Sequence, residues 1–154
     1  MITIERSVPI LIKSGNQLAG RHWAHKKGYR DRIFRDISWF FLTPDVPKDI
    51  FKKHVIVEIT RVMPKGCKKY DDENFSWGLK PVFDFLKQNG WIYEDSPKWV
   101  TRRYNQVRAV DLGKKDVEFG IIIKIMYPEQ GETVELDATG EYKWKQCGKG
   151  SLNS

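Results

Sequence analysis

The spacing of the hydrophobic residues alternates along the chain between the period of strands and the period of helices. Alternating apolar residues predict strands over residues 2–12, 54–63, 99–110 and 117–127. Apolar residues three and four positions apart predict helices over residues 21–41 and from after Asn74 to about Asn89. The order is therefore strand, helix, strand, helix, strand, strand. We expect one small α+β domain, in which two helices pack on a mixed sheet of about four strands.

The same spacing predicts which side chains face the core. Val55, Val57 and Ile59 share one face of the second strand. The first helix is expected to bury Ile33, Ile37 and Phe40, with Phe34 and Phe41 beside them. The last two strands are expected to pair as a hairpin whose loop is Leu112-Gly113-Lys114-Lys115.

The second helix contains two residues that disfavour a helix interior, Gly78 and Pro81. Proline is well tolerated only in the first turn, because its ring clashes with the preceding turn. The helix is therefore expected either to begin near Leu79 or to kink there.

The composition indicates one compact domain followed by a tail. Residues 1–128 are expected to form the domain, and the polar, glycine-rich residues 129–154 a tail that is weakly ordered or folds back as an extra strand. No apolar run is long enough to span a bilayer, and Met1–Arg6 lacks a signal-peptide pattern. Cys67 and Cys147 form no CxxC pair, so no thiolate zinc site is indicated. We expect a soluble cytoplasmic protein that does not bind membranes.

Carboxylates gather in one part of a chain whose net charge is +7. They are Asp71-Asp72-Glu73, Asp84 and Glu94-Asp95. Like charges in close proximity need a counter-charge, and a hard divalent cation such as Mg²⁺ prefers oxygen ligands. The positive remainder of the chain suits a polyanion. The combination favours an enzyme that acts on phosphodiester bonds.

Two interpretations of the acidic residues stay open on residue type alone. Acidic residues and Asn cap helix N-termini, and Glu94-Asp95 suits a turn. A metal site is favoured because Asp71 and Glu73 lie two apart in an extended segment, which points both side chains the same way. The acidic pair Glu94-Asp95 also returns one helix later.

The arrangement resembles the RusA family of Holliday junction resolvases. That family has an Asp-x-Asp-Asn motif, then Lys-x-x-x-Asp-x-Leu on a helix, then Gly, an apolar run and Asp-Asp. The corresponding segments here are Asp71-Asp72-Glu73-Asn74, Lys80-Pro81-Val82-Phe83-Asp84-Phe85-Leu86 and Gly90-Trp91-Ile92-Tyr93-Glu94-Asp95. Ser14-Gly15-Asn16 with Arg21-His22-Trp23 resembles the family's entry to its first helix. The resemblance spans about Ile4 to Tyr127.

The resemblance implies a small, homodimeric, Mg²⁺-dependent endodeoxyribonuclease of phage type, which resolves four-way DNA junctions by paired nicks in recombination and repair. Asp71, Glu73 and Asp95 would be the catalytic metal ligands, with Mn²⁺ as an alternative ion, and Lys80 the essential lysine. Asp72 or Glu94 is an alternative ligand. Asp84 is expected to pair with Lys80 at i, i+4.

Branched DNA, four-way junctions above all, is the expected partner. The residues expected to bind it are basic, or belong to the entry of the first helix: Asn16, Arg21, His22, Lys26, Lys27, Arg30, Lys68, Lys69, Arg102 and Arg103. Trp23, Trp77 and Trp99 are candidates to stack on unpaired bases, with packing in the core or its rim as the alternative.

Two departures from the family pattern favour a rival function without cleavage. Glu73 stands where the family commonly has Asp, and Lys80 follows Asn74 at a spacing three residues longer than in compact family members. A non-catalytic protein that binds branched DNA on the same scaffold is therefore one alternative. A magnesium-dependent nuclease that acts on flaps or on RNA is the other.

Overall fold

The computed structural model describes residues 1–42, 53–113, 118–129, 132–136 and 142–146. Its strands are β1 (Ile2–Val8), β2 (Val55–Met63), β3 (Val100–Arg108), β4 (Gly120–Tyr127), β5 (Glu132–Leu136) and β6 (Tyr142–Gln146). Its α-helices are α1 (Gly15–Leu18), α2 (Trp23–Ser38), α3 (Asp72–Gly78) and α4 (Lys80–Gln88), and a short 3-10 helix, η1, covers Ala109–Leu112. The expected α+β class with a four-stranded mixed sheet is confirmed, although the described residues form four α-helices instead of two.

The main sheet has the strand order β1-β4-β2-β3. Strand β4 pairs antiparallel with both β1 and β2, whereas β3 lies parallel to β2. Strands β3 and β4 are not neighbours, so the hairpin expected between residues 99–110 and 117–127 is wrong. Parallel neighbours need a long crossover, and α3 and α4 supply it between β2 and β3. Strand β4 instead fills the place between β1 and β2.

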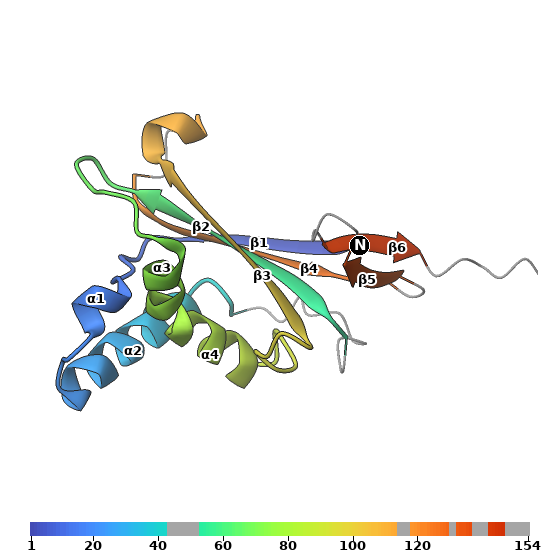
Figure 1. The fold of residues 1–154 in the computed structure, drawn as a ribbon, viewed down its shortest axis with the longest axis horizontal. Helices are drawn as coiled ribbons and strands as arrows, with labels where there is room; N and C mark the ends of the chain where they lie inside the picture. The colour runs from blue at the N-terminus through green and yellow to red at the C-terminus, as the bar shows by residue number, and fades with distance from the viewer. Residues whose placement is uncertain (43–52, 114–117, 130–131, 137–141, 147–154) are drawn as a thin grey trace, which may run out of the picture.

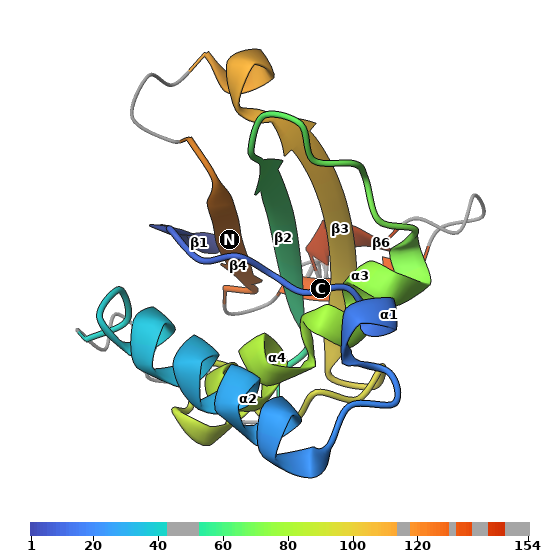
Figure 2. The ribbon, with the colours of Figure 1, turned by 90° about the vertical axis from the view of Figure 1, so that its left-hand side faces the viewer.

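The helices cover one face of this sheet (Figures 1 and 2), with α1 against α3 and α2 against α4. That face presents Val57 and Ile59 of β2 beside Ile123 and Ile125 of β4. The helices bury against it Ile33, Ile37, Leu79, Val82, Phe83 and Leu86. Each such side chain contributes about 1.5–3 kcal/mol on leaving water, so this layer supplies most of the driving force for folding.

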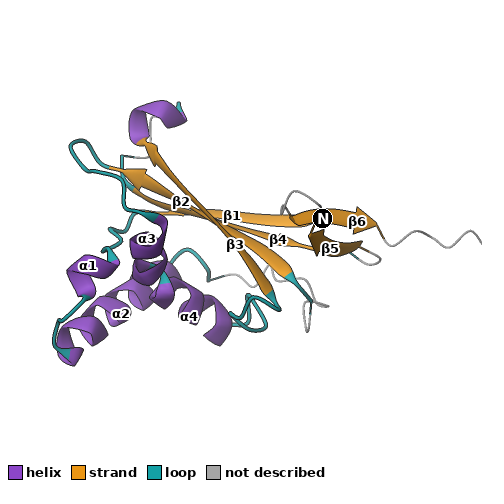
Figure 3. Cartoon of the chain, in the orientation of Figure 1, coloured by secondary structure: helices purple, strands orange, loops and turns teal. Residues whose placement is uncertain are grey.

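One prediction about the end of a helix is wrong. Phe40 is exposed, because α2 ends at Ser38 and the helical spacing no longer applies beyond it. Phe41 is buried, as expected, and packs edge-on against Trp91. The tail contains β5 and β6, which pair with each other in a separate two-stranded sheet. That sheet lies at the opposite end of the molecule from α1 (Figures 1 and 3).

The segment before α1 passes very close to the junction between α3 and α4. A Cβ atom at Gly78 would lie 1.8 Å from the carbonyl oxygen of Lys13, so no larger residue fits there without moving the backbone. The helix pair divides at this point, with Leu79 as the shared cap and Pro81 in the first turn of α4. The expectation of a helix start near Leu79 is confirmed, and a separate helix precedes it.

In the described part of the chain, no helix combines the length and apolar character needed to cross a membrane.

Replacing Gly78 by Ala should destabilise the protein by about 1–3 kcal/mol or more, because the added methyl overpacks a backbone contact. The matched control is Gly28→Ala in α2, where a Cβ meets nothing within 4 Å and the better helix former should add about 0.5–1 kcal/mol. Urea unfolding of the three proteins measures both effects as shifts of the midpoint. Equal stability of the two variants would contradict the account of Gly78.

Candidate nucleic-acid and metal site at the α3–α4 junction

Asp71 and Asn74 join the start of α3 to α1. Asp71 is the N-cap residue, and its Oδ1 accepts a hydrogen bond from the Asn74 amide nitrogen at 2.8 Å. Its Oδ2 accepts from Asn74 Nδ2 at 2.7 Å. The Asn74 Oδ1 then accepts from the backbone N–H of Asn16 at 3.1 Å. The capping role that residue type alone suggested is therefore present, and it also orients the Asp71 carboxylate.

The loop that leads to Asp71 is held by two side chains from the sheet. Gln106 on β3 makes two hydrogen bonds with the backbone of Tyr70, at 2.9 and 2.7 Å. Arg61 on β2 is only 5% exposed, donates to Gln106 Oε1 and to the carbonyl oxygen of Lys68, and lies 3.7 Å from the Tyr70 ring centre. Neither residue was singled out from the sequence. Arg61 continues the buried face of Val57 and Ile59, and a charge in that position was the available signal.

A pocket of about 840 Å³ opens between the four α-helices. Its charged lining residues are Lys26, Arg30, Glu73, Lys80 and Asp84, and its other lining residues are Gly15, Asn16, Leu18, Ala19, Tyr29, Asn74, Trp77 and Pro81. One helix ends and the next begins at Leu79. This break allows Glu73 of α3 and Lys80 of α4 to line the same pocket. Several residues expected at the site from distant parts of the sequence are thus brought together.

The ion pairs of the pocket differ from the expectation. Asp84 pairs with Arg30 of α2, whose Nε lies 3.8 Å from Asp84 Oδ2, and the predicted pair with Lys80 is wrong. The reason is that α2 packs along α4 and presents its own cation. Lys26, Lys80 and Glu73 are exposed and make no ion pair with any described residue. Two cations and one carboxylate are therefore available to a ligand.

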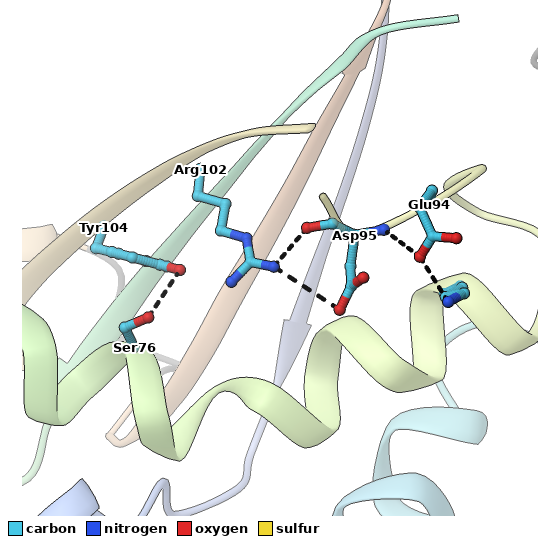
Figure 4. A network of polar contacts seen from close by, with 6 residues as sticks. Ser76, Glu94, Asp95, Arg102 and Tyr104 are labelled. Carbon is cyan, nitrogen blue, oxygen red and sulfur yellow. Dashed lines mark hydrogen bonds and ion pairs between the residues drawn. The ribbon is translucent and has the colours of Figure 1, made fainter. Parts of the chain in front are cut away.

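Asp95 lies after the end of α4 and is contacted by Arg102 of β3. Arg102 Nη2 donates to the Asp95 carbonyl oxygen at 2.6 Å and lies 3.8 Å from Asp95 Oδ2 (Figure 4). The Arg102 guanidinium also stacks on the Phe83 ring. The neighbouring Glu94 bonds to Lys87 at 2.5 Å. This bond lowers the pKa of Glu94 and raises the pKa of Lys87. Both acidic residues therefore have protein partners.

Over the residues that the structure describes, no three His, Cys, Asp or Glu side chains are grouped closely enough to hold a metal ion. Asp72 is exposed in the first turn of α3. Coordination of Mg²⁺ by Asp71, Asp72, Glu73 and Asp95 stays a prediction.

The residues expected to contact DNA fall into separate groups. Asn16, Lys26 and Arg30 line the pocket. Arg21 donates to the Gln17 carbonyl oxygen, His22 caps α2, and Lys27 pairs with Asp31 at 3.1 Å. Lys68 and Lys69 are exposed on the loop before α3. Arg102 and Arg103, as successive strand residues, point to opposite faces of the sheet.

No protein-family model and no curated protein matches this chain. The site must therefore be interpreted from its own residues.

The capping hydrogen bond of Asp71 should stabilise the fold, and this can be tested without any assay of activity. Asp71→Ala should cost about 1 kcal/mol of stability, whereas Asp71→Asn should cost only a few tenths, because Asn also caps helices well. Thermal unfolding of both variants measures the difference. Equal losses in the two variants would contradict a stabilising role for the capping hydrogen bond.

Tyr29 in the pocket floor makes stability depend on pH. Burial raises its pKa from 10 to about 12. The neutral phenol therefore favours folding fully below pH 10, and that contribution, about 2–3 kcal/mol, is lost as the pH rises from 10 to 12. Tyr29→Phe should be less stable than the parent by about 1–3 kcal/mol at pH 8, since Lys13 and Gly78 lose their hydrogen-bond partner.

The free-energy gap between the parent and Tyr29→Phe should then narrow towards pH 12. Urea unfolding across this range measures the gap. A gap that stays constant to pH 12 would contradict the role of the buried hydroxyl.

Proposed function

We propose that the protein is a Mg²⁺-dependent endodeoxyribonuclease that resolves four-way DNA junctions by paired nicks, in DNA recombination and repair. The observation that carries this proposal is the pocket itself. Asn16, Glu73 and Lys80 come from three separate segments of the motif, and all three line one space together with Lys26 and Arg30.

The charges of the pocket suit a phosphate. Lys26 and Lys80 have no carboxylate partner among the described residues, so neither must break an ion pair to bind. Lys80 would stabilise charge on the reacting phosphate as a compact cation. The net charge of +7 supports attraction of a polyanion, and the affinity should fall steeply with salt.

The start of α3 offers carboxylate oxygens, the donor type that a hard divalent cation prefers. Glu73 is an exposed carboxylate without an ion-pair partner among the described residues. Each Asp71 oxygen accepts one hydrogen bond from Asn74 and keeps a lone pair for another partner. When bound, Mg²⁺ would activate a water and neutralise developing charge on the phosphate. The family resemblance makes Asp95 a further candidate ligand, and in this structure Asp95 contacts Arg102.

The substrate implies a homodimer. Resolution of a four-way junction needs two matched nicks in opposing strands, and a two-fold dimer presents two identical sites in that relation. We therefore propose that two chains act together on one junction.

A second candidate is a non-catalytic protein that binds branched DNA. The pairing of Asp95 with Arg102 favours it, because that carboxylate is already neutralised within the protein. The two functions share the basic pocket and differ in whether bound DNA is cut.

Cleavage of a labelled four-way junction separates them. The parent protein should make paired, symmetric nicks that require Mg²⁺ and stop in EDTA. Asp71→Asn, Glu73→Gln and Lys80→Met should each lower the cleavage rate by about 100-fold or more, as loss of a group that stabilises developing charge does. Glu118→Gln, at an exposed carboxylate outside the pocket, is the control and should cut normally.

Tight junction binding by all these proteins without cleavage in Mg²⁺ or Mn²⁺ would overturn the nuclease and leave the binding protein. Preferential cutting of flaps or RNA in competition with junctions would overturn the proposed substrate.

A further inference from the structure

The structure separates the three tryptophans that were candidates for base stacking. Trp99 is partly buried and packs edge-on against Tyr93, with ring centres 4.8 Å apart. Trp23 is exposed at the start of α2 beside His22. Trp77 is 60% exposed and lines the pocket. Of these three, only Trp77 has an exposed ring in the same pocket as Lys26 and Lys80.

The base of the Trp77 side chain is fixed while its ring stays accessible. α1 packs so closely against it that a Cβ atom at Gly15 would lie 2.9 Å from Trp77 Cβ. The ring itself stays exposed, and an exposed aromatic ring is a suitable stacking platform for a base. Leu18 and Pro81 add apolar surface to the same pocket.

The charged residues that line the pocket indicate the charge of its ligand. The Arg30–Asp84 pair is neutral overall. Among the described lining residues this leaves Lys26 and Lys80 against Glu73, a small positive excess that suits a backbone phosphate. The pocket volume of about 840 Å³ lies within the range of pockets that enclose small ligands. A flat aromatic group attached to a phosphate matches both the ring and the cations.

We propose that this pocket binds one unpaired nucleotide, whose base stacks on Trp77 and whose phosphates contact Lys26 and Lys80. The inference rests on the proposed function, because it assigns the nucleotide to a strand of branched DNA. A base inside a duplex has both faces covered by its neighbours, so only an unpaired base can stack on Trp77. The pocket would thereby let the protein distinguish branched or single-stranded DNA from an intact duplex.

Binding to an eight-nucleotide single strand that contains 2-aminopurine tests this in EDTA, where cleavage plays no part. Stacking on Trp77 should quench the 2-aminopurine fluorescence. Trp77→Ala should weaken binding roughly 5- to 150-fold, as loss of one stacked base does, and Trp77→Phe should retain most of the affinity. Trp39→Ala, which removes a similarly exposed tryptophan outside the pocket, is the matched control and should change affinity less than twofold.

Duplex binding gives the second comparison. Trp77→Ala should leave affinity for a fully paired duplex unchanged, whereas Lys26→Ala and Lys80→Ala should each reduce the salt dependence of single-strand binding by about one unit of slope. Unchanged single-strand affinity in a folded Trp77→Ala variant would overturn the inference, as would equal losses in the Trp77 and Trp39 variants.

The test of nucleotide binding at Trp77 and the test of junction cleavage can succeed or fail independently. Stacking on Trp77 in a protein that never cuts a junction would support the pocket and overturn the proposed activity. Mg²⁺-dependent junction cleavage in a protein whose single-strand binding ignores Trp77 would do the reverse.

Discussion

The hydroxyl group of Tyr29 joins the three segments around which the pocket is built. It accepts a hydrogen bond from the Lys13 backbone N–H at 3.2 Å and donates one to the Gly78 carbonyl oxygen at 2.7 Å. The side chain is 5% exposed, so these bonds compete little with water. Gly78 can approach Lys13 this closely only because it has no side chain. The entry to α1, the middle of α2 and the α3–α4 junction are therefore held as one unit.

The proposed function rests on what this unit brings together. The α3–α4 division at Leu79 begins a new helix at Lys80, which lines the same pocket as Glu73. Asn74 bonds to both Asp71 and Asn16 and so carries the acidic segment to α1. On the sheet side, Arg61 and Gln106 support the preceding loop. Carboxylates, an open tryptophan ring and two lysines without an ion-pair partner among the described residues thereby line or border one pocket, as the proposed recognition and cleavage of a nucleic-acid strand would require.

The sequence predicted the features that depend on local spacing. The apolar period identified β2, the core face of α4 and the α+β class, and the Asp71–Asn74 segment was recognised from residue type. Strand neighbours were missed, because alternation in 117–127 shows which side chains are buried and not which strand they pair with. The partners of Asp84 and Asp95 were missed for a related reason. Arg30 and Arg102 reach them only through helix and strand packing.

We propose that the start of α3 and the start of α4 share one site for a cation and a phosphate. Paramagnetic broadening by Mn²⁺ in the NMR spectrum of the ¹⁵N-labelled protein tests it directly. If the site is shared, the amide signals of residues 71–74, 79–81 and 15–16 should broaden before all others at low Mn²⁺. Broadening that begins at other carboxylates, such as Asp31 and Asp36 on α2, with these signals unaffected, would contradict it.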